Sequence, residues 1–291
     1  MADWNHLPKH HVLYQFALQV DQITAEADHN EMYGIMLQPT KEGDKPSHTT
    51  LIILQKFLRA NAGDLPKAKT QLLEALNWRK QYRPLEAKDE VFSKAKFGGL
   101  GYVTRLKGVV DTANEEGVAT FNIYGAAAKN PKKTFGDVDA FIRWRIALME
   151  LTLSALALNT ATLPIPDYGA GPDPYQALQI HDYLSVSFFR QPAEVKASSS
   201  RIITLFSKYY PETVSYKYFV NVPIVMQWMM GTMKMLLSSD AVKKMTWMTY
   251  GSELVQYLGQ GVGKEYGGQG PSLSEMGETV TYDDDVEAKK A

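Results

Sequence analysis

The sequence contains no cysteine among its 291 residues. Disulfides, thiolate metal sites, cysteine nucleophiles and iron–sulfur clusters are therefore excluded. A reducing compartment suits such a chain, although the absence of cysteine does not require one. The remaining composition, 45% hydrophobic and 22% charged, is typical of a globular protein with one large domain or two modest ones.

The chain also lacks an excess of charge of one sign and any long hydrophobic run. Its formal net charge is -1, whereas a nucleic-acid-binding protein normally carries a basic excess, so nucleic acid is not an expected partner. The longest uncharged apolar segments, 151–166 and 219–233, are shorter than the roughly 18 to 20 residues that span a bilayer, and prolines interrupt both. The polar N-terminus has no secretory pattern. We therefore expect a cytoplasmic protein that meets membranes only at their surface.

The apolar pattern divides the chain into three parts. Before about residue 95 it is helical, with Leu51, Leu54 and Leu58 on one face and a helix expected from the Asp64 cap onward. After about residue 96, strand patterns alternate with long helices, which predicts an α/β domain with a mostly parallel sheet over 96–270. Residues 271–291 are polar and acidic, and we expect them to be a disordered tail.

The segment QIHDYLSVSFFR, residues 179–190, is predicted to be a buried strand that carries polar side chains. Alternate residues of a strand share a face. One face then holds His181, Tyr183, Ser185, Ser187 and Phe189, and the other holds Ile180, Asp182, Leu184, Val186 and Phe188. From the residues alone, the imidazole and phenol are either hydrogen-bonded core groups or the lining of a ligand site. We interpret Asp182 as a structural hydrogen-bond acceptor.

Methionine is concentrated in residues 223–248, which hold seven of the twelve methionines. A helix that is apolar on nearly every side is buried or covers something apolar. Methionine is flexible and polarisable and adapts to irregular surfaces. Two interpretations stay open, an ordinary core helix and a movable lid over an apolar pocket.

Several segments, in their order along the chain, resemble the CRAL-TRIO family, whose members carry single lipids. The segment FLRANAGDLPKAKTQLLEALNWRK is similar to its N-terminal helical signature, and TFGDVDAFIRWRIALMELTLSAL, HDYLSVSF, FSKYYPETVSYKYFVNVPIVM and KEYGG are similar to its lipid-binding domain. The resemblance covers roughly residues 48 to 268 and is closest to the fungal phosphatidylinositol-transfer proteins. It implies a helical lobe, a sheet floor and an apolar pocket closed by a gate helix, which would be the Met-rich segment.

The resemblance also implies residues for the lipid headgroup. The glutamate of the YPE motif is Glu212, and the family's lysine after the gate best matches Lys244. A basic pair that helps the best-known members is replaced here by Asn61 and Ala62, which weakens the predicted contact with an inositol phosphate. Phe189 interrupts the alternate serines of phosphatidylcholine binders, so a choline lipid is not expected.

One subgroup of these fungal proteins binds haem through an H-x-Y pair, and His181-Asp182-Tyr183 resembles that pair. Tyrosine is an axial ligand of ferric haem in other proteins. The resemblance therefore implies haem b with Tyr183 as the axial iron ligand. His181 would assist through a hydrogen bond or as a reserve ligand.

The subgroup also implies supporting residues, namely Tyr124, Lys217 and an arginine of the FIRWR segment. Cationic side chains suit the carboxylate groups of haem propionates. Arg143 and Arg145 lie about 200° apart around a helix, so only one of them faces the pocket. We favour Arg145.

Three functional hypotheses follow from the sequence and the resemblance. The first is a non-enzymatic carrier of phosphatidylinositol, with haem bound in the same pocket and peripheral association with the endoplasmic reticulum or other internal membranes. The second is a haem-dependent redox enzyme or stress sensor that uses this pocket. The third is an adaptor that presents a lipid to a lipid kinase. Whether haem and lipid compete is left open at this point.

Overall fold

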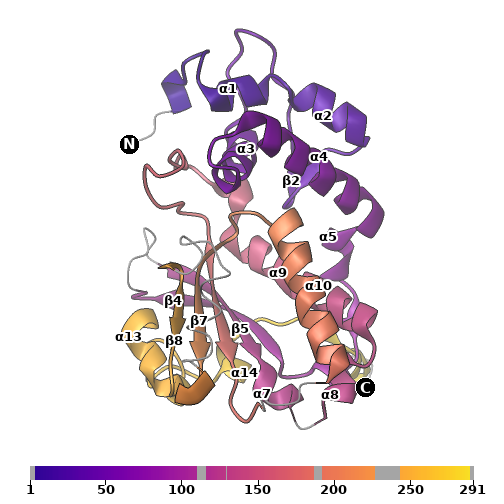
Figure 1. Ribbon diagram of the computed structural model, residues 1–291, viewed down its shortest axis with the longest axis vertical. Helices are drawn as coiled ribbons and strands as arrows, with labels where there is room; N and C mark the ends of the chain where they lie inside the picture. The colour runs from indigo at the N-terminus through magenta and orange to yellow at the C-terminus, as the bar shows by residue number, and fades with distance from the viewer. Residues whose placement is uncertain (1–3, 110–115, 129, 187–191, 227–242, 289–291) are drawn as a thin grey trace.

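The computed structural model describes residues 4–109, 116–128, 130–186, 192–226 and 243–288 (Figure 1). The segments between these ranges include most of the predicted gate helix, together with Ser187 and Phe189, and they lie outside the described residues.

The N-terminal part is helical, as predicted. Its elements are α1 (Val12–Ala17), α2 (Val20–Ala27), the hairpin of β1 (Glu31–Met32) and β2 (Ile35–Met36), α3 (His48–Ala60), α4 (Leu65–Tyr82) and α5 (Pro84–Ala87). The Asp64 carboxylate accepts a hydrogen bond from the Lys67 backbone N–H, 3.1 Å away, and Pro66 lies in the first turn of α4. These two residues start α4 where the sequence predicts it to start.

A five-stranded sheet forms the centre of the rest of the chain. Its strands, in spatial order, are β4 (Gly101–Lys107), β5 (Glu116–Ile123), β6 (Ala177–Asp182), β7 (Val214–Val220) and β8 (Met245–Trp247). Only β4 is antiparallel to its neighbour, and the other pairs are parallel. The predicted α/β class with a mostly parallel sheet is therefore confirmed.

The two faces of the sheet are covered by different segments. Helix α9 (Val138–Leu156) lies on one face, where the Thr120 and Thr152 hydroxyl oxygens are 2.8 Å apart, and α10 (Ala193–Tyr209) packs against α9 (Figure 1). The short helices α7 (Tyr124–Ala127) and α8 (Pro131–Phe135) precede α9. The opposite face packs on a C-terminal segment that includes two 3₁₀ helices, Gly251–Leu254 and Lys264–Tyr266, and α13 (Val255–Leu258).

The prediction of a disordered tail is wrong for residues 271–288, which fold back onto the domain. They form α14 (Leu273–Met276), β9 (Thr281–Tyr282) and α15 (Asp283–Ala288), and β9 pairs in parallel with β3 (Val91–Phe92) just before α6 (Lys94–Phe97). Glu278 exchanges two backbone hydrogen bonds of 2.8 Å with Val103, at the edge of the sheet. The prediction followed the polar composition of this segment, but three of its apolar side chains are buried against the domain, those of Leu273, Val280 and Tyr282.

Strand β6 also ends earlier than predicted, at Asp182. The Asp182 carboxylate accepts a hydrogen bond from the Leu184 backbone N–H at 2.9 Å, an arrangement that turns the chain out of the sheet. Ser185 has a φ of 65° and does not continue the strand face. The same carboxylate accepts hydrogen bonds from the Asn221 amide at 2.8 Å and the Tyr266 hydroxyl at 2.9 Å. Asp182 is thus the structural acceptor that the sequence indicates.

Candidate functional site

A row of rings crosses the sheet on the face that α9 covers. The register of the parallel strands places Asn122, His181, Phe219 and Trp247 side by side. The ring centroids of His181 and Phe219 are 5.0 Å apart, and those of Phe219 and Trp247 are 3.8 Å apart, with interplanar angles of 14° and 11°. Because the rings stack from strand to strand, their edges point away from the sheet. Ring edges carry the positive side of the aromatic quadrupole.

Tyr124 and Tyr183 join this row from the ends of their strands. Tyr124 follows β5, and its ring centroid is 5.8 Å from that of His181, with nearly parallel planes. Tyr183 follows β6, and its ring centroid is 5.3 Å from Tyr124 and 6.3 Å from Phe219. The structure therefore brings together the two aromatic residues of the H-x-Y pair and Tyr124. Phe219 and Trp247 were missed by the sequence analysis, although strand alternation with Lys217 would have placed Phe219 on this face.

Two cationic side chains share this region, and neither forms an ion pair with a carboxylate of the described residues. Arg145 is only 3% exposed, and its guanidinium carbon lies 5.5 Å from the ring centroid of Phe206 and 5.8 Å from that of Trp144. Its Nε is buried and has no hydrogen-bond partner in the part of the chain that the structure describes. Lys217, on β7, forms no ion pair with any residue that the structure describes.

Arg143 faces elsewhere. It forms an ion pair with Glu90, whose two carboxylate oxygens lie 3.0 and 3.1 Å from its Nε, and it donates to the Tyr82 backbone carbonyl at 2.8 Å. Of the two arginines of the FIRWR segment, Arg145 is the one that faces the sheet.

The pKa shifts of these residues have burial as their main cause. Burial lowers the pKa of His181 well below its usual range, and the positive charges of Lys217 and Arg145 lower it further. Burial raises the pKa of the Tyr183 phenol, and Tyr124 adds to this. The pKa of Lys217 is lowered by burial and by the charge of Arg145. The site therefore holds a neutral imidazole, neutral phenols and two cationic groups, a combination that favours an anion.

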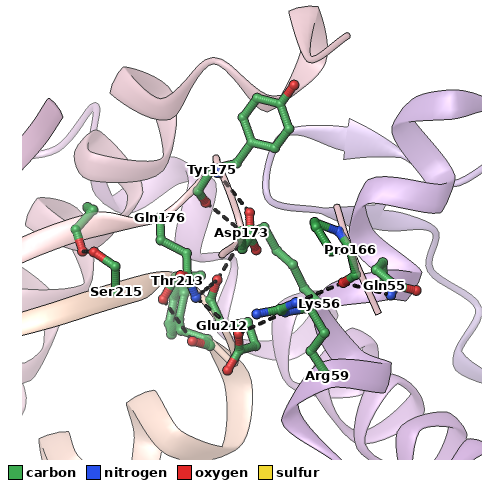
Figure 2. Close-up of polar contacts among 12 residues, drawn as sticks. Gln55, Lys56, Arg59, Pro166, Asp173, Tyr175, Gln176, Glu212, Thr213 and Ser215 are labelled. Carbon is green, nitrogen blue, oxygen red and sulfur yellow. Dashed lines mark hydrogen bonds and ion pairs between the residues drawn. The ribbon is translucent and has the colours of Figure 1, made fainter. Parts of the chain in front are cut away.

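The two predicted headgroup residues lie apart from each other, and only Glu212 is remote from the aromatic row. The Glu212 carboxylate accepts hydrogen bonds from Arg59 Nε at 3.3 Å and Gln176 Nε2 at 3.0 Å (Figure 2). Lys244 is exposed at the start of β8, where its backbone carbonyl accepts a hydrogen bond from the Lys217 N–H at 2.9 Å. Among the described residues, no hydrogen bond or ion pair joins Glu212 to Lys244, and their headgroup role stays a prediction.

A buried lysine beside Glu212 was missed by the sequence analysis. Lys56 Nζ, on α3, donates to Asp173 Oδ2 and the Tyr175 carbonyl, both at 2.7 Å, and to the Glu212 carbonyl at 2.9 Å (Figure 2). The signal in the sequence is a lysine between the apolar residues 51–54 and 57–58 of α3. These bonds tie the helical lobe to the segments that lead into β6 and β7.

The aromatic row and the Glu212 cluster lie toward opposite ends of β7. Glu212 precedes this strand, and Phe219 lies near its end. Seven residues of extended chain span about 20 Å, at roughly 3.3 Å per residue. Glu212 is thus separated from the aromatic row by the length of β7, whereas Lys244 lies next to Lys217.

Neither a protein-only metal cluster nor a membrane span occurs in the described part of the chain. No group of three or more His, Cys, Asp or Glu side chains there could hold a metal ion, and no described helix is long and apolar enough to cross a bilayer. Haem iron needs only one or two axial protein ligands. The Tyr183 oxygen as a ligand, the two cations for carboxylate groups and the row of aromatic rings fit such a group.

The protein consists of a helical lobe and an α/β domain with a mostly parallel sheet. Its candidate site, on one face of that sheet, has the residues of a ligand-binding site. The chain belongs to the CRAL-TRIO family. The family model of the CRAL/TRIO domain matches residues 125–268, and that of the CRAL/TRIO N-terminal domain matches residues 12–74.

Relatives with known names support this assignment. The chain is 48% identical over 280 residues to the phosphatidylinositol transfer protein SFH5 of Phaeosphaeria nodorum, covering 96% of this chain and 83% of that protein. It is 46% identical over 284 residues to the protein of that name in Botryotinia fuckeliana, and this match covers 96% of the chain. It is 47% identical over 277 residues to that of Sclerotinia sclerotiorum, and this match covers 94% of the chain. It spans only 62% and 64% of these two proteins, less than two thirds of their length.

A solved structure has the same fold. The crystal structure of Sfh5 superimposes with a TM-score of 0.77 at 29% sequence identity, and the match covers 96% of this chain and 94% of that one. The predicted family and fold are thereby confirmed, whereas the haem-binding subgroup stays a prediction.

Proposed function

We propose that this protein is a non-enzymatic carrier that transfers phosphatidylinositol and that also binds haem on the α9 face of its sheet. The names of its relatives support phosphatidylinositol transfer and favour a carrier over an enzyme. The haem proposal rests on one observation, the buried Arg145 beside Lys217 and His181, with an Nε that has no hydrogen-bond partner among the described residues.

A buried cation without an anionic partner is energetically unfavourable. Removing an ion from water costs several kcal/mol even after relaxation, and a charge-assisted hydrogen bond to an anion offsets part of this cost. No carboxylate of the described residues stands beside Arg145 or Lys217 to supply that anion. We infer that an anionic group of a ligand does so, and the two propionates of haem are carboxylates of this kind.

The neighbouring rings suit a flat ligand. The edges of these rings form the floor of the site. The negative face of an aromatic ligand is attracted to the positive edges of other rings. When bound, ferric haem would supply an iron that takes a tyrosine oxygen as a protein ligand, and the proton of that phenol would leave to solvent. Tyr183 would be this ligand and His181, neutral because of its lowered pKa, would hydrogen-bond to the phenolate. Tyr124 would pack against the ligand.

The experiment is a visible absorption spectrum of protein produced with ample iron and haem precursor. The wild type is expected to show a Soret band that Tyr183→Phe removes or shifts. The control is Tyr168→Phe, which changes an exposed tyrosine and should leave the spectrum unchanged. A colourless wild type, with haem supply verified, would reject haem as the ligand and leave phosphatidylinositol transfer untouched.

Transfer of phosphatidylinositol is tested separately. The expected headgroup residues are Glu212 and Lys244, and transfer of labelled phosphatidylinositol between vesicles should fall in Glu212→Gln and Lys244→Ala. Because Glu212 also contacts Arg59, its variant needs a thermal unfolding measurement to show that the lobes stay joined. Normal transfer by both variants would reject these headgroup roles.

Contact with membranes is supported by an exposed apolar group. Leu184, Ile224, Val225 and Tyr250 are all exposed and lie in the segments that directly follow β6, β7 and β8. The ends of parallel strands lie at one edge of a sheet, so these side chains gather there. We infer that this edge meets the surface of the endoplasmic reticulum or another internal membrane from the cytoplasm. Vesicle sedimentation should detect binding that Ile224→Ser with Val225→Ser weakens.

A further inference from the structure

Asn122 and Arg145 face the same small cavity beneath the aromatic row. The cavity has a volume of about 10 Å³. It is lined by Leu100, Asn122, Ile123, Tyr124, Phe135, Phe141, Trp144 and Arg145. Two of the polar side chains that line it are almost completely buried, with exposed fractions of 1% for Asn122 and 3% for Arg145.

Each of these side chains has one buried polar atom without a hydrogen-bond partner among the described residues, and Trp144 Nε1, in the lining of the same cavity, is a third such atom. The Asn122 amide nitrogen donates to the Ile180 backbone carbonyl at 3.1 Å. This contact fixes the orientation of the amide, since only its nitrogen can donate to a carbonyl. Asn122 Oδ1 is therefore left as an unsatisfied acceptor, and Arg145 Nε is left as an unsatisfied donor. Buried polar atoms of this kind are nearly always satisfied by protein or by ordered water.

We propose that one internal water molecule occupies this cavity, accepts a hydrogen bond from Arg145 Nε and donates one to Asn122 Oδ1. A cavity of about 10 to 15 Å³ is the smallest that holds a water, and such a water needs at least two polar partners. An anion would be repelled by the amide oxygen, and an apolar group would leave both atoms unpaired. Water is the occupant that matches both the size and the chemistry.

The water gives Asn122 a role in positioning Arg145. It occupies the Nε edge of the planar guanidinium, so that the Nη groups stay available for the anion of a ligand. Asn122 is thus a positioning residue for the anion site. This second step rests on the proposed function, whereas the water itself does not.

The water is tested by a crystal structure of the ligand-free wild type at a resolution that shows ordered waters. We expect a single density peak within hydrogen-bond distance of both Asn122 Oδ1 and Arg145 Nε. An empty cavity, or an Arg145 Nε that donates to a protein group instead, would overturn the proposal whether or not the protein binds haem.

The positioning role is tested with Asn122→Asp, which puts a carboxylate beside Arg145 in place of the amide. Haem affinity should fall by about tenfold or more, because Arg145 gains an internal anion that competes with the ligand. Affinity for haem dimethyl ester, whose propionates carry no charge, should change much less. Equal losses for both ligands would show a merely structural effect and overturn the role of Asn122.

Two controls separate the possible failures. Asn122→Leu removes the acceptor without adding charge, so it should lose the water but bind haem more tightly than Asn122→Asp. Tighter or equal binding by Asn122→Asp would contradict the positioning role. If the wild type binds no haem, the proposed function fails and the positioning role fails with it, while the crystallographic test of the water stands.

Discussion

Lys56 and Asp173 form an ion pair of 2.7 Å in which both side chains are completely buried. Lys56 comes from the helical lobe, and Asp173 lies four residues before β6. Burial lowers the pKa of Lys56, and the charge of Asp173 opposes this shift. The pair therefore joins the lobe to the sheet through a contact that depends on both charges.

Lys56→Met should reduce the free energy of unfolding by about 3–5 kcal/mol, because it leaves the Asp173 carboxylate buried and unpaired. The double variant Lys56→Met with Asp173→Leu should lose much less, since neither charge is then buried. Urea unfolding measures both. Lys67→Met is the control, as Lys67 is exposed and should change stability by less than ~1 kcal/mol. A loss below that level for Lys56→Met would show that the pair contributes little.

Arg145→Leu should separate stability from ligand binding. Removing a buried cation without a partner should leave the ligand-free protein as stable as the wild type or more stable by about 1–3 kcal/mol. Binding of haem should be greatly weakened. Thermal unfolding and a haem titration measure the two effects.

The control for Arg145→Leu is Arg143→Leu, which breaks the ion pair with Glu90. This variant should be less stable than the wild type and should bind haem normally. A large loss of stability in ligand-free Arg145→Leu would mean that Arg145 has a partner within the protein.

His181 should make the ligand-free protein less stable at mildly acidic pH. Its folded-state pKa is depressed by burial and by Lys217 and Arg145, so below the unfolded-state value near 6.5 the unfolded chain binds a proton that the folded protein does not. Stability is then lost as the pH falls below about 6.5, by as much as about 2 kcal/mol between pH 7 and pH 5. Urea unfolding should show this loss in the wild type and a smaller one in His181→Gln.

Other groups are common to both proteins in that comparison. His48, whose pKa is also lowered by burial, contributes equally to each profile. Parallel pH profiles of the wild type and His181→Gln would therefore contradict a depressed pKa for His181.

Removal of residues 271–291 should destabilise the domain and expose the edge of its sheet. The deletion removes the buried side chains of Leu273, Val280 and Tyr282, each worth about 1.5–3 kcal/mol when fully buried, and the two hydrogen bonds between Glu278 and Val103. An unpaired edge strand promotes association. Thermal unfolding and size-exclusion chromatography measure these effects.

A matched variant tests whether charge alone holds this tail. Asp284→Asn removes the exposed ion pair with Lys94 and should cost less than ~1 kcal/mol. A truncated protein with the same thermal stability as the wild type, and with no additional association in size-exclusion chromatography, would show that the tail contributes nothing.

Much of the fold could be predicted because local rules specify it. The Asp64 cap and Pro66 mark the start of α4, and alternation in SYKYFVNV marks β7 (Val214–Val220), since cap geometry and side-chain period depend only on neighbouring residues. The end of β6 could not be predicted in this way. Asp182 turns the chain out of the sheet only because its carboxylate is also held by Asn221 and Tyr266, which are distant in sequence.

The amino-acid sequence by itself determined the class of the fold, the absence of thiol chemistry and the presence of His181 and Tyr183 near one strand, because composition and period are local properties of the chain. Only the tertiary structure decided that Arg145 rather than Arg143 faces the sheet, and that Arg145 Nε lies there without a hydrogen-bond partner among the described residues. A hydrogen-bond partner is supplied by whichever segment packs nearby. Whether a charge is satisfied is therefore a property of the folded molecule and not of its sequence pattern.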